Sequence, residues 1–184
     1  MHRREVVRLL AASAGIGWLE GLDVEELLRV GRRLHARAAG AQAWRALGAH
    51  AVRTVTVAAE RIIPADDTPG ATDAGVTAFI DHMLADWYEP AERDRLLRGL
   101  AELDDRARGL AERDFIELPE ADQVAVLSAI DAEAGAGDHW FATLKFLTVW
   151  GYFTSEVAVR ETLGEFPLPG RYDGCAPYQP LRRS

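Results

Sequence analysis

The stretch from residue 60 to residue 81 constrains the fold most, because it holds the end of one helix, a tight turn and the start of another helix. The first helix must stop at Pro64, which lacks an N–H and whose ring clashes with a continuing helix. Residues suited to tight turns follow, namely Asp66, Asp67, Pro69 and Gly70. Thr72 or Asp73 can then cap a new helix, so the segment predicts a rigid elbow between two helices.

Apolar residues elsewhere recur at the three- and four-residue spacing of helices, and almost no stretch alternates as a strand does. Residues 38–50 are rich in Ala and Gly, which predicts a loop or a loosely formed helix. The expected fold is an all-α, single-domain, irregular helical bundle. The expected helices cover about residues 23–37, 50–63, 76–87, a segment opening at Pro90, a segment from Pro119 to Gly135, and 138–163.

Residues 138–163 differ from the other helices, because apolar side chains point in nearly every direction around the predicted helix. A helix that is apolar on all sides is either the central helix of a bundle or one side of an interface. Aromatic residues are enriched among interface anchors, so both interpretations stay open. The side chains of this helix that we expect to reach a partner are Trp140, Phe146, Trp150 and Phe153.

The last part of the chain, residues 164–184, contains too many Pro and Gly residues for a regular helix. It nevertheless keeps aromatic residues, which disordered tails normally lack. We expect an extended arm that lies on the body of the protein or on a partner through Phe166, Tyr172 and Tyr178.

The first residues combine Arg3 and Arg4 with an Ala-rich, mildly apolar run over residues 9–16. This order resembles a twin-arginine export motif, and the alternative is a basic first helix packed on the body. The chain is therefore expected to divide into three parts. These are a signal or N-terminal helix over 1–20, a helical domain over 21–163 and the arm over 164–184.

The composition limits which partners and sites are possible. The 184 residues are 48% hydrophobic, which suits one globular domain, and the net charge of −8 opposes nucleic-acid binding. No apolar run approaches the roughly 20 residues that span a bilayer. The single Cys175 excludes an internal disulfide and any zinc or iron–sulfur site built on several cysteines.

The sequence shows no catalytic constellation. The histidines lack the spacing of a di-iron bundle or a zinc hydrolase, and no Gly-x-Gly-x-x-Gly opens a helix after a strand. We therefore expect no catalytic, cofactor-binding or metal-binding residue in this chain. The alternative is a stand-alone helical enzyme whose metal or acid–base site would use Asp66, Asp67, Asp81 and His82.

Several short sequence segments of the elbow resemble those of one protein family. They are Ile62-Ile63-Pro64-Ala65-Asp66, Pro69-Gly70-Ala71, Ala74-Gly75-Val76 and Phe79-Ile80-Asp81. These phrases are similar to the small subunit (subunit 3, or gamma) of bacterial gluconate 2-dehydrogenase-type flavoprotein complexes. The similarity covers most of the chain, and small subunits of this family often carry a twin-arginine signal.

The resemblance implies a non-catalytic subunit of a sugar or polyol dehydrogenase complex. The redox chemistry would belong to a large FAD-dependent subunit of the glucose-methanol-choline type, with a cytochrome c subunit as a possible electron acceptor. The small subunit would support the folding, stability and twin-arginine export of the large one to the periplasm, or stay cytoplasmic if the signal does not function. A helical adaptor unrelated to redox chemistry is the remaining alternative.

Overall fold

The computed structural model describes residues 24–38, 43–134 and 139–162, and these residues form helices and connecting loops without any strand. The expectation of an all-α fold is therefore confirmed. The helices are α2 (Val24–Ala38), α3 (Ala49–Ile62), α4 (Val76–Asp86), α5 (Pro90–Ala111), α6 (Glu120–Ala134) and α7 (Trp140–Thr154), with a 3-10 turn η2 (Phe115–Glu117) and a π-helical turn η3 (Ala158–Thr162).

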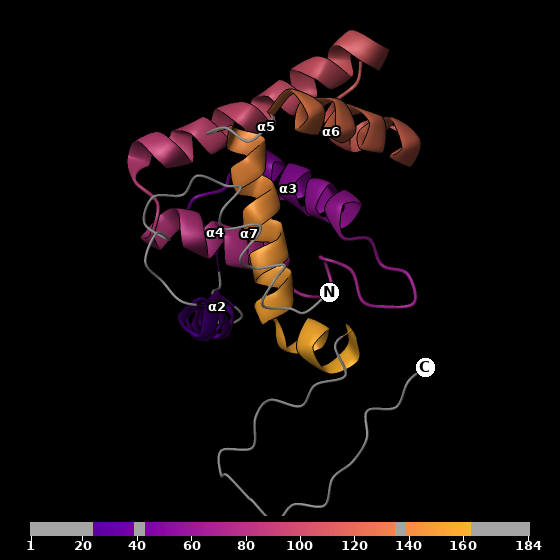
Figure 1. The fold of residues 1–184 in the computed structure, drawn as a ribbon. Coiled ribbons are helices and arrows are strands. Elements are labelled where there is room, and N and C mark those ends of the chain that lie inside the picture. The colour runs from indigo at the N-terminus through magenta and orange to yellow at the C-terminus, as the bar shows by residue number, and fades with distance from the viewer. Residues whose placement is uncertain (1–23, 39–42, 135–138, 163–184) are drawn as a thin grey trace, which may run out of the picture.

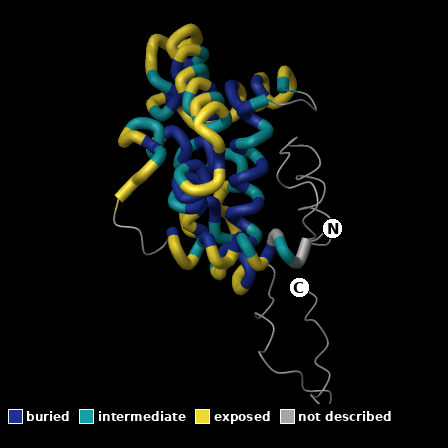
Figure 2. The backbone as a smooth tube through the Cα atoms, turned by 90° about the vertical axis from the view of Figure 1, so that its left-hand side faces the viewer, coloured by how far each residue is buried: buried dark blue, intermediate teal, exposed yellow. Residues whose placement is uncertain are grey.

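Helix α7 is the centre of the fold. It packs against α2, α3, α4, α5 and α6, and Figure 1 shows it crossing the middle of the molecule with α5 and α6 at one end. The side chains of Phe146 and Trp150 are each only 1% exposed, and Trp140 is 6% exposed. Figure 2 shows the same pattern as dark blue through the inner helices and yellow along the outer turns. The all-round apolar pattern of α7 therefore fits its place inside the chain's own core.

Two glycines allow helices to approach α7 closely. A Cβ atom on Gly99 of α5 would lie 2.0 Å from the Trp140 ring, and a Cβ atom on Gly31 of α2 would lie 2.5 Å from Thr154. These distances are far inside van der Waals contact, so any larger residue would force the helices apart. The glycines thus fix how near α5 and α2 lie to the central helix.

Hydrogen bonds hold the elbow between α3 and α4, and its Ala71 and Ala74 are buried in the core. The carboxylate of Glu60 accepts the backbone N–H of Ala65 at 2.9 Å and both the N–H and the hydroxyl of Thr72 at 2.9 and 2.6 Å. The hydroxyl of Tyr152 on α7 donates to the carbonyl of Pro69 at 2.7 Å. The predicted turn between two helices is confirmed, and hydrogen bonds tie it to α3 and to α7.

The expected cap of α4 was wrong. Helix α4 begins at Val76, and its N-cap is Gly75 in the left-handed conformation at φ 68°. Thr72 and Asp73 lie in the turn before it, where Thr72 bonds Glu60 and Asp73 accepts the N–H of Gly70. The left-handed backbone favours glycine, which has no Cβ to clash.

Helix α2 packs on α4 and α7 through one face and presents arginines on the other. Its inward face includes the buried Leu28 and Leu34 and the partly buried His35, whose ring stacks on Phe79 with ring centres 4.8 Å apart. The His35 Nε2 atom also lies 2.5 Å from the carbonyl oxygen of Gly151. The outward residues of α2 include Arg29, Arg32, Arg33 and Arg37.

Candidate functional site

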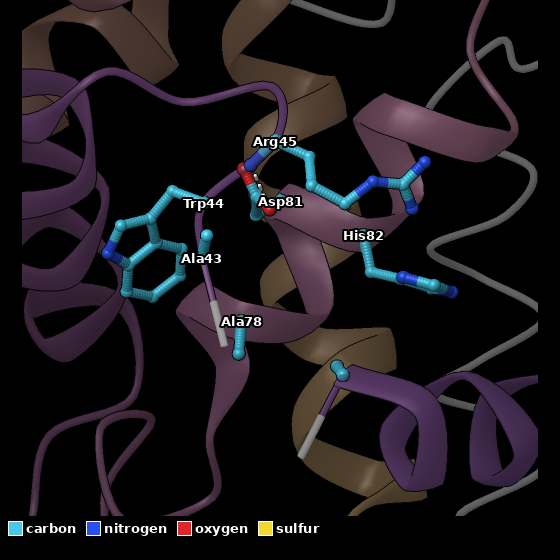
Figure 3. Close-up of a pocket in the computed structure, with 7 residues that line it drawn as sticks. Ala43, Trp44, Arg45, Ala78, Asp81 and His82 are labelled. Atoms are coloured by element: carbon cyan, nitrogen blue, oxygen red, sulfur yellow. Dashed lines mark hydrogen bonds between the residues drawn. The ribbon is translucent and has the colours of Figure 1, made fainter. Parts of the chain in front are cut away.

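A pocket of about 180 Å³ opens where the end of α2, the loop over residues 43–48 and helix α4 meet. We call it the α2–α4 pocket, and Figure 3 shows the side chains around it. Three alanines line it together with one tryptophan and three charged or titratable side chains. The lining residues are Ala38, Ala43, Trp44, Arg45, Ala78, Asp81 and His82.

Asp81 fixes the loop at the mouth of this pocket. Its carboxylate accepts the backbone N–H groups of Arg45 at 3.0 Å, Ala46 at 2.9 Å and Leu47 at 2.8 Å. Asp81 is almost completely buried, so these bonds compensate the loss of water around its charge. The loop has no regular structure of its own, and Asp81 supplies the acceptors that a strand or helix would otherwise provide.

Arg45 and Asp86 form an ion pair beside the pocket, with their charged atoms 2.6 Å apart. The hydrogen bond from the Arg45 guanidinium lowers the pKa of Asp86, and the same bond raises the pKa of Arg45. Both charges are therefore balanced locally. The pair joins the 43–48 loop to the last turn of α4.

His82 is the polar residue of the pocket whose bonding is incomplete. Its side chain is only 10% exposed, and its Nε2 atom has no hydrogen-bond partner among the described residues. Asp86 Oδ2 lies 3.3 Å from that atom, so the two side chains form an ion pair one turn apart on α4 when the imidazole is protonated.

Two tryptophans near the ends of these elements are unusually exposed. Trp44 in the loop is 49% exposed, and Trp87 at the end of α4 is 44% exposed. Trp44 lines the pocket and Trp87 does not. In Figure 3 the Trp44 indole and the His82 imidazole lie on opposite sides of Asp81. Exposed aromatic rings beside a pocket are typical of sites that bind other molecules.

A second polar cluster joins α3, α5 and η2. His50 Nε2 lies 2.6 Å from Asp104 Oδ2, and Asp104 Oδ1 accepts the N–H of Phe115 at 2.9 Å. The carboxylate of Asp114 lies within 4.8 Å of these ligand atoms, but it accepts the guanidinium of Arg108 at 2.9 Å. Each member therefore already has a protein partner, and the cluster acts as a structural junction.

The structure does not bring together the four residues of the alternative metal or acid–base site. Asp66 lies at the elbow, where its carboxylate accepts the N–H of Thr68, whereas Asp81 holds the 43–48 loop. Among the described residues, His50, Asp104 and Asp114 lie close enough together to share an ion. None of the four residues of the alternative site belongs to that group. Asp67, at the elbow, and His82, on α4, also belong to different elements.

The proposed partner residues on α7 are placed in the core. Trp140, Phe146 and Trp150 are buried inside this chain, so they offer no exposed ring to a partner in this structure, and only Phe153 is partly exposed. The physical reason is that five other helices cover α7. The remaining site residues lie outside the described part of the chain, namely Phe166, Tyr172, Tyr178, Arg3 and Arg4.

The comparison with protein families identifies the chain. The family model for gluconate 2-dehydrogenase subunit 3 matches residues 49–170. This chain belongs to the gluconate 2-dehydrogenase subunit 3 family. No curated protein and no solved structure matches it. Among the described residues, every helix of this family member is too short or too polar to cross a bilayer.

The family match begins at α3, so α2 and the 43–48 loop precede it. The sequence did not reveal the α2–α4 pocket, because four of its seven lining residues lie between residues 38 and 50, where we expected a loop or a loosely formed helix. The sequence feature that could have indicated the pocket is Trp44-Arg45 within an Ala- and Gly-rich stretch. The small neighbouring residues cannot cover the large Trp44 ring, which is exposed in the structure.

Proposed function

We propose that this chain is the non-catalytic small subunit of an FAD-dependent sugar or polyol dehydrogenase complex. The observation that carries the proposal is the match of residues 49–170 to gluconate 2-dehydrogenase subunit 3. The catalytic partner is a large subunit of the glucose-methanol-choline type that binds FAD, and a cytochrome c subunit accepts its electrons. The small subunit supports folding and stability of the large one.

The use of buried polar groups supports an accessory role. Asp81 holds the 43–48 loop, and Asp104 joins α5 to η2 and α3. Gln123 on α6 accepts the guanidinium of Arg61 at 2.8 Å and donates to the carbonyl of Phe115 at 3.3 Å. These side chains are engaged in joining elements of the fold, as expected of a chain whose task is to present a stable surface.

Co-expression with the large subunit tests the proposal. The large subunit is produced alone and together with this chain, and its soluble yield, FAD absorbance and dehydrogenase activity are measured for each preparation. We expect a stable heterodimer on size exclusion and a several-fold higher FAD-loaded yield in the presence of the small subunit. Equal FAD loading and no co-elution would contradict an accessory role.

The export part of the proposal needs its own test. Replacing Arg3 and Arg4 by Lys removes the arginine pair and keeps both charges. If the small subunit carries the large one through twin-arginine export, both chains should then accumulate in the cytoplasm. Unchanged periplasmic dehydrogenase activity in this variant would show that the large subunit does not depend on residues 3 and 4 of this chain.

A further inference from the structure

We propose that acid loosens helix α2 from α4 and α7, and that protonation of His35 causes this loosening. The proposal concerns this chain alone, so it does not depend on the large subunit. Three observations carry it: where the His35 ring lies, which charged groups surround it, and how α2 is attached to the rest of the fold.

The His35 ring contacts both of the helices on which α2 packs. It stacks on Phe79 of α4 with ring centres 4.8 Å apart, and its Nε2 atom lies 2.5 Å from the carbonyl oxygen of Gly151 on α7. Because a carbonyl oxygen only accepts hydrogen bonds, Nε2 carries the hydrogen. A further proton must therefore go to Nδ1, and no described residue accepts a hydrogen bond from that atom.

The other charged and titratable groups on α4 and α7 have partners of their own, so none is available to neutralise a protonated His35. They are Asp81, bonded to the 43–48 loop, Asp86, paired with Arg45 and next to His82, Lys145, paired with Asp131, and Tyr152, bonded to Pro69.

Helix α2 itself adds positive charge near this ring. Glu26 pairs with Arg29, so their charges balance. Arg32, Arg33 and Arg37 are exposed on the same helix and have the sign of a protonated imidazole. A proton on His35 therefore adds a buried positive charge to a helix that is already basic.

The latched and released states of α2 differ in how well they bind this proton. Burial lowers the pKa of His35, and the carbonyl of Gly151 opposes this only in part. The Phe79 ring attracts a cation weakly, whereas the loss of water acts on the whole charge. On a released and solvated α2, histidine has a pKa of about 6.5. The packing of α2 is therefore strongest above that pH and weakens as the pH falls below it.

Helix α2 can separate while the other helices stay packed. Figure 1 shows it at one edge of the molecule, and it packs mainly on α4 and α7, whereas α3 to α7 also pack on one another. Phe79 and Gly151 are buried where α2 covers them. Release of α2 would thus uncover an apolar surface between α4 and α7 at acid pH, which is covered at neutral pH.

Amide hydrogen exchange of the whole chain tests the proposal. The protection of residues 24–38 and of α5 is measured at pH 7.5 and pH 5.5 and corrected for the intrinsic pH dependence of exchange. His35→Gln keeps a donor for Gly151 but cannot titrate. His82→Gln is the matched control, because it removes another largely buried histidine, on α4. Circular dichroism first establishes that each variant folds.

We expect α2 to be at least about tenfold less protected than α5, because it opens separately. In the wild type its opening should increase about threefold to tenfold from pH 7.5 to pH 5.5, and tenfold is about the limit that one histidine sets over this range. The increase should persist in His82→Gln and fall below twofold in His35→Gln.

Three results would overturn the proposal. Equal protection of α2 and α5 would mean that α2 opens only when the whole protein unfolds. Unchanged opening of α2 in the wild type would mean that acid does not act on it. An increase in His35→Gln as large as in the wild type would mean that another group takes up the proton.

A second measurement needs only the wild type. NMR titration of the His35 ring signals gives the pKa of this side chain in the folded protein. We expect a midpoint below the value of about 6.5 that an unburied histidine has. A midpoint at or above 6.5 would overturn the proposal, because acid would then stabilise the packing of α2 or leave it unchanged.

Discussion

Asp81 shows how one side chain can hold a segment that has no secondary structure. Its carboxylate binds three successive backbone N–H groups that lie 34 to 36 residues earlier in the chain. From the sequence, Asp81-His82 resembles an ordinary exposed pair on a helix, because nothing local reveals that a distant loop returns to it. The identity of the residue was visible in the sequence, but its role depends on tertiary structure.

Replacing Asp81 by Ala should therefore destabilise the protein strongly. The change leaves three N–H groups without an acceptor, and we expect a loss of about 2 kcal/mol or more in the free energy of unfolding. The control is Asp86→Ala, which removes a partly exposed carboxylate that pairs with Arg45 and lies 3.3 Å from His82, and it should cost less than about 1 kcal/mol. Urea unfolding measures both. Equal losses in the two variants would rule out the loop-holding role of Asp81.

His35 should make the stability of the protein depend on pH. Burial lowers the pKa of His35, partly opposed by its bond to the carbonyl of Gly151. The unfolded chain, in which a histidine has a pKa of about 6.5, then binds the proton first as pH falls. This contribution to stability is therefore complete above pH 6.5 and is lost progressively toward the lower pKa of the folded state.

The measurement compares the unfolding free energy of the wild type and of His35→Gln between pH 8 and pH 5. Glutamine can still donate to Gly151 but does not titrate. We expect the difference between the two proteins to shift against the wild type as the pH falls. Parallel curves over the whole range would mean that His35 titrates alike in the folded and unfolded states.

Helix α5 contains two glycines with opposite roles, which the sequence alone cannot distinguish. A Cβ atom on Gly99 would lie 2.0 Å from the ring of Trp140, whereas a Cβ atom on Gly109 would meet nothing within 4 Å. Both glycines stand in the same helix, so their intrinsic cost to helix formation is the same, about 1 kcal/mol relative to alanine. Packing decides which one the fold requires.

Gly99→Ala should destabilise the protein by about 1–3 kcal/mol, because a methyl group there must displace a buried ring. Gly109→Ala should instead stabilise it by about 0.5–1 kcal/mol through lower flexibility of the unfolded chain. Thermal unfolding of the two variants measures both effects. A stabilising Gly99→Ala would show that α5 can move away from α7 without loss.

The sequence predicted which segments form helices more accurately than it predicted where each helix begins and ends. Pro64 and Pro90 marked a helix end and a helix start, because proline acts through its own ring and its missing N–H. The start of α4 was misjudged, since Glu60 captures Thr72 and leaves Gly75 to take the left-handed cap position. That competition for Thr72 involves a residue 12 positions away, which local capping rules ignore.

At the scale of the whole molecule, α2 precedes the region that matches the family model and packs onto it. The region that matches the family begins at residue 49, yet α2 rests on α4 and α7 within it. The pattern around α7 left open whether a partner or the chain itself covers that helix. In the structure the chain itself covers Trp150 and Phe146, because α2 to α6 and the following turn η3 all pack against α7.

Gly31→Leu should detach α2 and leave the rest of the protein folded. A Cβ atom at residue 31 would lie 2.5 Å from Thr154, so a leucine cannot fit there. Trypsin should then cleave the variant rapidly at Arg29, Arg32 and Arg33, while most of the helical circular dichroism is kept. Ala36→Leu, at an exposed position of the same helix, is the control and should resist trypsin like the wild type.

The hydrogen bonds of the elbow also imply an order of events during folding. Glu60 joins residues only 5 and 12 positions away, whereas the Tyr152 hydroxyl reaches Pro69 across 83 positions. Short chain closures cost less entropy and form sooner, so the corner between α3 and α4 should be present in the transition state before α7 locks it. Stopped-flow kinetics should then show that Glu60→Gln slows refolding, whereas Tyr152→Phe mainly speeds unfolding.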